Sequence, residues 1–263
     1  MSKDKTQYQE QGRSISVVYP YVHEVDGPST FAQWEELRYS MRSLKNLNAD
    51  IEVFVFGDDP GWFSGHVNFV PLARICDNPP LDIVNKLKAV INHPDITDDF
   101  IWMNDDIYFI NPVELWEVFM LKAMNNLADL NLKAKNLWYR NLIKTKEKLI
   151  ELKLSTWNYS THLPFVYNKG KMKELIKVFD LENNSFLITT LYHNYCFPKT
   201  MPLLLNGKLD DIKIAAYKKE FNYERMKHFF LYKKFFNHSM QGFGKNVVKL
   251  LTETFPEPSI YEE

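Results

Sequence analysis

The chain has 263 residues with a formal net charge of −1, and 45% of them are apolar, 15% aromatic and 25% charged. The length predicts one large domain, or one domain with an insertion, around a substantial buried core. The near-neutral charge excludes a global attraction to nucleic acid or membranes, and nine glycines exclude collagen-like and glycine-linker chains. Two cysteines, Cys76 and Cys196, are too few for a disulfide framework and match no metal-binding spacing.

Residues 1–13 are polar, so we expect a flexible tail at the start of the chain. They contain no apolar stretch of the kind that signal peptides carry. No run in the sequence approaches the roughly 18 apolar residues that a membrane-spanning helix needs. From these features we expect a cytoplasmic protein.

Alternating strand and helix patterns fill the chain up to residue 110. β-branched and aromatic residues at 14–22, with Pro20 marking the strand end, predict a first strand. The recurrence of Leu37, Met41 and Leu44 on one helical face predicts a helix. By the same criteria, the expected strands are 14–22, 51–57, 66–72 and one that runs from residue 100 to the acidic pair at 105–106, and the expected helices are 34–47 and 81–92. This order predicts an α/β fold with a mixed, mostly parallel sheet flanked by helices.

The second half of the chain has mainly helical periodicity. Apolar residues recur at helical spacing from 112 to 154, which predicts a helical insertion at about 113–155 on one side of the sheet. Further along, we expect a loop or short strand at 158–167, a helix at 171–179, a mixed segment at 184–198, a short strand at 209–214, a helix or loop at 215–224, an aromatic and basic segment at 228–236 and a terminal helix at 246–252. Residues 14–263 are expected to form a single domain.

The pattern is organised around residues 100–110, where two apolar runs flank Asn104, Asp105 and Asp106. A short apolar run with polar boundaries predicts a buried strand. Adjacent carboxylates at its end are costly unless a cation or water meets them, and ligands bind at the strand ends of parallel sheets. Hard divalent cations prefer oxygen ligands. We therefore expect the pair to hold a metal that bridges a nucleotide's phosphates; the alternative is a solvated turn between two hairpin strands.

Four motifs follow one another along the chain: EELRYSMRS at 35–43, FIWMNDD at 100–106, HLP at 162–164 and FPEPSIYE at 255–262. Together, and in this order, they resemble the Stealth family of sugar-phosphate transferases. The chain is even more similar to small phage-type glycosyltransferase-like proteins, which share this layout and have a helical insertion before the His-x-Pro element. The resemblance implies a nucleotide-sugar-binding fold of GT-A type and, for a phage-encoded chain, a location in the host cytoplasm.

One departure from the Stealth pattern bears on the reaction. Stealth transferases have an arginine after the His-x-Pro region that is implicated in catalysis, and residues 185–195 contain no arginine here. This difference favours ordinary glycosyl transfer from a nucleotide sugar. Sugar-1-phosphate transfer of the Stealth type is the alternative.

The implied chemistry assigns metal and donor roles to residues near strand ends. A divalent cation would stabilise the departing diphosphate, and Mn²⁺ and Mg²⁺ both suit oxygen ligands. Asp106 is expected to be the first metal ligand, Asp105 to contact the metal through water or the ribose, and Asn104 to orient one of them. His238 lies where many GT-A enzymes place a late metal ligand; a surface histidine is the alternative.

The expected donor is a nucleotide sugar, with a UDP-sugar as the first choice. The remaining residues expected to bind it are Tyr19, Pro20, Arg38, Gly57, Asp58 and Lys86. The first strand would receive the base or ribose through backbone groups, and the end of the second strand would meet the base. Lys86 would neutralise the diphosphate as a point charge, or else be a solvated helix lysine. Arg38 would reach a phosphate, or else pair with surface acids such as Glu35.

His162 is the expected catalytic partner of Asp106 on the acceptor side. The ordinary pKa of histidine is near neutrality, so its ring can bind or deprotonate an acceptor, and Pro164 restricts the backbone beside it. The alternative is a structural histidine. The acceptor stays open between a glycan, a protein and a modified DNA base.

Two hypotheses from other classes remain. Residues 213–234 carry lysines and an arginine interleaved with aromatics, a combination that can contact phosphates and stack on bases. The segment therefore predicts a nucleic-acid-binding protein, or else a solvated helix face with an apolar underside. A catalytically inactive carbohydrate-binding protein is the third class.

Overall fold

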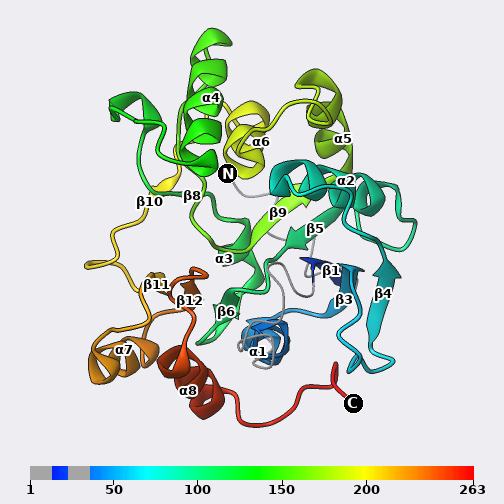
Figure 1. Cartoon of the computed structure of the whole chain (residues 1–263), viewed down its shortest axis with the longest axis vertical. Helices are drawn as coiled ribbons and strands as arrows, with labels where there is room; N and C mark the ends of the chain where they lie inside the picture. The colour runs from blue at the N-terminus through cyan, green and yellow to red at the C-terminus, as the bar shows by residue number, and fades with distance from the viewer. Residues whose placement is uncertain (1–13, 23–35) are drawn as a thin grey trace.

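The structure is a computed structural model that describes residues 14–22 and 36–263. The tail expected at 1–13, the loop after the first strand and the beginning of the helix expected at 34–47 lie outside the described residues. The centre of the molecule is a five-stranded sheet in the order β4-β3-β1-β5-β9 (Figure 1). Its strands are β1 (Ile15–Tyr21), β3 (Ile51–Gly57), β4 (Val67–Pro71), β5 (Asp99–Trp102) and β9 (Phe165–Asn168).

Within this sheet β4, β3, β1 and β5 run parallel, whereas β9 pairs with β5 in the antiparallel direction. Successive side chains of a strand point to opposite faces, so Val17 and Val18 enter two different hydrophobic clusters. Burial on both faces accounts for the nearly continuous apolar runs in β1 and β3. The predicted fold class, a mixed α/β fold with a mostly parallel sheet flanked by helices, is confirmed.

Helices cover both faces of the central sheet (Figure 1). On one face, Leu37 and Met41 of α1 pack against β1 and β3. On the other face, Leu87, Leu175 and Leu191 come from three different helices and fill a second cluster. These elements are α1 (Glu36–Ser43), α2 (Pro79–Asn92), α5 (Lys169–Val178) and α6 (Ile188–Cys196). The helix expected at 81–92 thus begins two residues earlier, because prolines are tolerated in the first turn of a helix.

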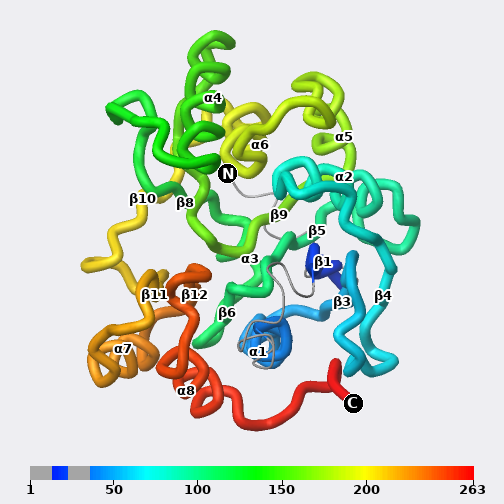
Figure 2. The backbone as a smooth tube through the Cα atoms, viewed as in Figure 1, coloured from blue at the N-terminus to red at the C-terminus, as the bar shows by residue number. Residues whose placement is uncertain are grey.

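The chain leaves the central sheet directly after β5. A turn at Asp105 and Asp106 leads into β6 (Ile107–Phe109), which pairs with β12 of a second sheet in the order β11-β12-β6. Figure 2 shows the backbone passing from the large sheet into this smaller one. The strand predicted to run from residue 100 into the acidic pair is β5, and the apolar run after the pair forms β6 in the other sheet. The alternative of a hairpin is wrong, because β5 pairs with β1 and β9 and not with β6.

The second sheet has its own hydrophobic cluster. Phe236 of β12 packs with Phe230 and Leu250 from the two helices that flank it. The elements are β11 (Lys213–Ala216), β12 (Phe235–His238), α7 (Tyr223–Phe230) and α8 (Lys245–Thr254). The strand predicted at 209–214 thus lies later in the chain, and the segment predicted at 228–236 is divided between α7 and β12. The segment called mixed at 184–198 contains α6.

The stretch from 112 to 154 is helical only in part, so that prediction was wrong in detail. Its elements are β7 (Val113–Glu114), α3 (Leu115–Phe119), β8 (Lys122–Ala123), the 3₁₀ turn Leu127–Asp129 and α4 (Leu137–Glu151). Two of them form short parallel ladders with distant strands, β7 with β2 (Leu47–Asn48) and β8 with β10 (Leu203–Leu204). α4 begins where the Asn136 side chain caps the backbone N–H of Tyr139 at 3.0 Å.

Two further observations concern the whole described chain. Cys76 and Cys196 are both free thiols. In residues 14–22 and 36–263, no helix has the length and apolar character that crossing a membrane requires.

Candidate active site

The site candidate is an acidic cluster at the junction of the two sheets. Asp105 and Asp106 form the turn after β5, where Met103 N–H still donates to Val18 O at 3.0 Å. Because β1, β3 and β5 run parallel, their carboxyl ends lie along the same edge of the sheet. Glu36, in the first turn of α1, completes the cluster.

Burial and neighbouring negative charge disfavour the ionised forms of Glu36 and Asp105. Burial, followed by the charges of Asp105 and Asp106, raises the pKa of Glu36 to about 9. Burial, followed by the charge of Asp106, raises the pKa of Asp105 to about 7. Raised carboxyl pKa values of this kind are typical of acidic side chains that lie close together and are shielded from water. A cation bound here would relieve that repulsion.

Asp106 is the member with spare ligand capacity. Within the described residues its Oδ1 atom is buried without a hydrogen-bond partner. Its Oδ2 atom lies 3.7 Å from Nδ1 of His162, whose side chain is 45% exposed. The structure thus brings together Asp106 and His162, the two residues predicted to be catalytic. Whether they take part in catalysis stays a prediction.

The backbone at His162 is unusual and is held by a lysine. His162 has φ of 48°, in the left-handed region that few non-glycine residues occupy and that often marks functional sites. Lys213 of β11 donates its Nζ proton to the carbonyl of the preceding Thr161. Burial lowers the pKa of Lys213 to about 8, against the opposing effect of the Asp106 charge. Lys213 therefore supports the turn that carries His162.

His238 lies beside the cluster and is buried, so the alternative of a surface histidine is wrong. Its Nε2 atom is 2.9 Å from the Tyr108 hydroxyl and 3.9 Å from Oε2 of Glu36. Its Nδ1 atom is 3.3 Å from Ser239 O. Burial lowers the pKa of His238 below its ordinary value, although the Asp106 charge opposes this. Both ring nitrogens have partners, so a ligand role for His238 stays a prediction that this geometry does not favour.

A preformed metal cage is not part of this arrangement. Among residues 14–22 and 36–263, no three histidine, cysteine, aspartate or glutamate side chains converge as ligands on one point. A hard divalent ion does not require such a cage when substrate phosphates and water complete its coordination. The unpartnered oxygen of Asp106 within a group of carboxylates fits that kind of ion.

Two of the residues expected to bind the donor lie within the sheet. Tyr19 pairs with Val55 and Pro20 with Phe56, so β1 continues through Pro20 to Tyr21, within the predicted range 14–22. Proline is tolerated there because the ladder with β5 has already ended at Val18. Both residues lie in the ladder with β3, and contact of their backbone groups with the base or ribose stays a prediction.

Gly57 and Asp58 do lie at the carboxyl edge, as predicted. Gly57 has φ of 148°, and a Cβ there would lie 1.7 Å from the carbonyl oxygen of Tyr21. Only glycine therefore allows β1 and β3 to approach at this point. The backbone N–H of Asp58 donates to the same oxygen at 3.3 Å. Contact of either residue with a base stays a prediction.

Lys86 is buried, so the alternative of a solvated helix lysine is wrong. Its side chain is 1% exposed and forms an ion pair with Asp82 one turn earlier in α2. Asp82 also accepts a hydrogen bond from the backbone N–H of Ile75 at 3.0 Å. This pairing gives Lys86 a structural role within α2. Contact with a diphosphate stays a prediction without support from these contacts.

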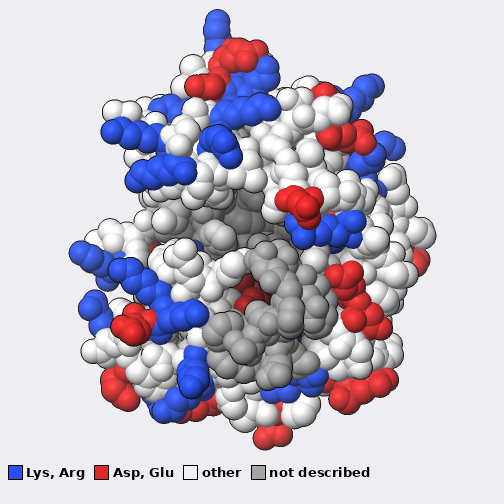
Figure 3. Space-filling model, in the orientation of Figure 1, with Lys and Arg blue, Asp and Glu red and all other residues white. Residues whose placement is uncertain are grey.

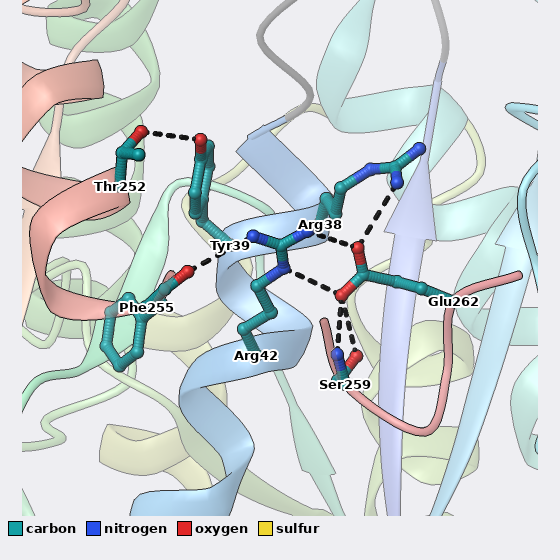
Figure 4. A network of polar contacts seen from close by, with 7 residues as sticks. All are labelled: Arg38, Tyr39, Arg42, Thr252, Phe255, Ser259 and Glu262. Carbon is teal, nitrogen blue, oxygen red and sulfur yellow. Dashed lines mark hydrogen bonds and ion pairs between the residues drawn. The ribbon is translucent and has the colours of Figure 1, made fainter. Parts of the chain in front are cut away.

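Arg38 faces the C-terminal segment (Figure 4). Its NH1 atom lies 3.2 Å from Oε2 of Glu262, and its guanidinium stacks over Trp62. Arg42 binds both carboxylate oxygens of Glu262, at 2.8 and 2.6 Å. Burial alone would raise the pKa of Glu262, but hydrogen bonds from Arg42 and Ser259 outweigh it and the pKa is lowered. The segment thus fastens α1, the helix that carries Glu36, and phosphate binding by Arg38 stays a prediction.

Several lysines of the basic and aromatic segment at 213–234 bind carbonyl or carboxylate groups of the protein itself. Buried Lys233 donates to the carbonyls of Gly207 and Asp210, as Lys213 does to Thr161. The segment also forms ion pairs, Lys227 with Glu253, Lys233 with Asp210 and Lys234 with Glu117. Figure 3 shows lysines and arginines on the left of the view, over α4 and α7, separated by uncharged atoms. The segment forms the strand β11 and the helix α7 and ends directly before β12, and this weakens the nucleic-acid hypothesis.

Three contributors to the site were not predicted from the sequence. Glu36, Tyr108 and Lys213 reach the acidic pair from α1, β6 and β11. Glu36 belongs to the EELRYSMRS motif, which was the available signal. Tyr108 follows Asp106 by two residues, but its composition as part of an apolar run gave no sign of a role in the site. Lys213 carried no signal, because only the sheet β11-β12-β6 places it near Asp106.

The carboxylate cluster predicts how stability depends on pH. In metal-free protein between pH 6.5 and 8, folded Glu36 and part of Asp105 keep protons that the unfolded chain has lost. Fewer protons on the unfolded state mean that stability falls as pH rises, by about 1.4 kcal/mol per pH unit for each retained proton. Urea unfolding in EDTA across this range measures the slope. Glu36→Gln should flatten it, whereas the surface variant Glu151→Gln should not; equal slopes in all three proteins would contradict the prediction.

Comparisons with known proteins leave the chain without an assigned family. No protein-family model matches it, and no curated protein matches its sequence. Among solved structures it is similar to the apo form of the glycosyltransferase GlyE of Streptococcus pneumoniae TIGR4, with 12% identity and a TM-score of 0.45. The match covers 93% of this chain and 60% of that chain. At this identity and TM-score, the likeness establishes no activity for this chain.

Proposed function

We propose that this protein is a metal-dependent glycosyltransferase of GT-A type. It would transfer a sugar from a nucleotide-sugar donor, with a UDP-sugar as the first choice, to an acceptor hydroxyl. The observation that carries the proposal is the cluster of Glu36, Asp105 and Asp106 at the carboxyl edge of a mostly parallel sheet. That edge is where open α/β sheets bind ligands, and three crowded carboxylates favour a cation.

A divalent metal fits the donor set of the cluster. Asp106 and Asp105 would hold Mn²⁺ or Mg²⁺ through carboxylate oxygens, together with substrate phosphates and water. Asp106 Oδ1, which has no partner within the described residues, is the first ligand candidate. When bound, the metal would neutralise the charge that develops on the departing diphosphate. Glu36 would add negative charge beside the ligands and strengthen their hold on the ion.

The reaction is a substitution at the anomeric carbon of the donor sugar. A bond forms between the acceptor oxygen and that carbon, and the bond from that carbon to the diphosphate breaks. The nucleoside diphosphate leaves with the electron pair, and the acceptor proton passes to a base. His162 is the base or acceptor-binding group in this proposal, since its half-exposed ring lies 3.7 Å from Asp106. Lys213 would orient that ring through the Thr161 carbonyl.

A thermal-shift screen of nucleotide sugars, with Mn²⁺ and with EDTA, tests the proposal. A donor present at a hundred times its dissociation constant should stabilise the protein by about 2.7 kcal/mol. The shift should require the metal, and the free nucleoside should give much less. A screen in which no nucleotide sugar stabilises the protein in Mn²⁺ would contradict it.

Product analysis separates the two kinds of transfer. An acceptor that gains the sugar alone, with release of the nucleoside diphosphate, fits glycosyl transfer. An acceptor that gains sugar-1-phosphate, with release of the nucleoside monophosphate, would replace this proposal by the Stealth-type alternative.

A further inference from the structure

A cavity of about 460 Å³ lies beside the acidic cluster. Its floor is formed by Trp102, Phe165 and Tyr167 of strands β5 and β9. Its walls come from the beginnings of three helices, α2, α4 and α6, represented by Ile83, Leu137 and Ile188. The volume falls within the range of small-molecule sites, roughly 300–1,000 Å³.

The cavity reaches the candidate active site at one end. Asn104, next to Asp105 in the turn after β5, and His162, 3.7 Å from Asp106, both belong to its lining. A molecule in the cavity would therefore present one end to the Asp106–His162 pair. The rest of that molecule would lie between the helices, on the β9 side of the sheet.

The chemistry of the lining does not suit a nucleotide. Among the described residues that line it, none is a lysine, an arginine, an aspartate or a glutamate, so a diphosphate would lose its hydration without a charged partner. Aromatic and aliphatic side chains dominate instead. At the start of α4, Leu137 and Trp138 are 38% and 40% exposed and belong to the same lining. Exposed apolar residues gathered at a concave site are typical of ligand-binding surfaces.

We propose that this cavity binds the apolar aglycone of the acceptor, an aromatic or branched hydrocarbon group attached to the part that carries the reacting hydroxyl. The inference rests on the proposed glycosyl transfer and names its acceptor class. The aglycone lies against Trp102, Ile83 and Leu137, and the hydroxyl end reaches Asn104 and His162. The donor occupies the other side of the acidic cluster, toward the ends of β1 and β3.

The test compares glycosides that differ in the aglycone alone. The probes are 4-methylumbelliferyl and methyl β-glycosides of glucose, galactose and N-acetylglucosamine, titrated without any nucleotide sugar and followed by ligand-observed NMR. The aryl glycosides should bind at least about tenfold more tightly, because only they bury an aromatic ring in the cavity. Equal binding of aryl and methyl glycosides would overturn the proposal.

Two variants and a matched control locate the binding. Leu137→Glu puts a charge into the lining and should weaken aryl binding about tenfold or more; Ile83→Trp should do the same by filling the space. Ile150→Glu alters a residue of α4 that is 51% exposed and lies outside the lining, so it should bind like the wild type. Unchanged aryl binding in folded Leu137→Glu and Ile83→Trp would place the probe elsewhere and refute the assignment.

The donor provides an independent readout. Stabilisation by a nucleotide sugar in Mn²⁺ should be the same in Leu137→Glu as in the wild type. Tight aryl binding without any donor binding would refute the proposed function and leave the cavity as a binding site. Donor binding without aryl selectivity would refute the cavity assignment alone.

Discussion

Replacing Asp106 with asparagine is expected to slow sugar transfer by roughly 10³-fold or more, since a lost metal ligand removes several kcal/mol of transition-state stabilisation. Asparagine keeps the size of the side chain, and Asp106 Oδ1 has no hydrogen-bond partner to lose within the described residues. The fold should therefore persist. The measurement is the single-turnover rate with the donor that the screen identifies, beside a thermal unfolding curve.

The matched control is Asp211→Asn, a change of the same kind at an exposed position of the loop before β11. Its transfer rate should equal that of the wild type. A folded Asp106→Asn protein with a wild-type rate would remove Asp106 from the site. The metal-dependent mechanism would then lose its main residue.

The second large effect concerns His162. Its φ of 48° is tolerated better by asparagine than by most other residues, so His162→Asn removes the ring with little added backbone strain. Loss of a general base or acceptor-binding group typically costs about 10²–10⁴ in rate. Transfer should fall by this amount, whereas donor affinity, measured by calorimetry, should change little.

A structural role for His162 predicts a different pattern. If the ring only supports the turn beside Lys213, its loss lowers stability and weakens donor and acceptor steps together. Equal losses in donor affinity and transfer rate, with a lower melting temperature, would contradict a role in the chemistry. A stable variant with unchanged transfer would exclude His162 from the acceptor side.

The central sheet could be predicted from the sequence because local residue patterns define its strands. The strand predicted at 51–57 matches β3 (Ile51–Gly57) residue for residue, and the one predicted at 66–72 matches β4 within one residue at each end. Apolar runs bounded by Asp, Pro and Gly define such strands without any knowledge of their neighbours. The parallel order followed from the intervening helices, since right-handed crossovers allow few other arrangements.

The second sheet, β11-β12-β6, could not be predicted from local sequence signals. β6 and β12 have three and four residues and pair across more than a hundred residues of chain. Their residues are mostly aromatic, and β12 follows a basic segment whose composition is equally compatible with a helix face. Register here is set by tertiary contacts, such as Tyr108 against Phe236, and no local pattern encodes them.

The residues of the candidate site also differ in whether a local sequence signal or a tertiary contact reveals them. Asp105, Asp106 and His162 could be singled out, because an acidic pair after an apolar run and a His-x-Pro element are local signals. The burial of Lys86 was not predicted: its i,i+4 spacing to Asp82 favours an ion pair, but no local pattern shows that the rest of the fold covers both side chains. Glu36 and Lys213 become neighbours of Asp106 only when α1 and β11 dock against the turn after β5.

Calorimetric titration of UDP tests the central claim most directly, because it probes diphosphate binding without knowledge of the sugar. In Mn²⁺, wild-type protein and Asp211→Asn should bind UDP with the same affinity, and EDTA should abolish the heat in both. Asp106→Asn should show no metal-dependent binding while it melts like the wild type. Undiminished UDP binding by Asp106→Asn in Mn²⁺, or equal binding by the wild type in Mn²⁺ and EDTA, would contradict a metal site at the acidic cluster.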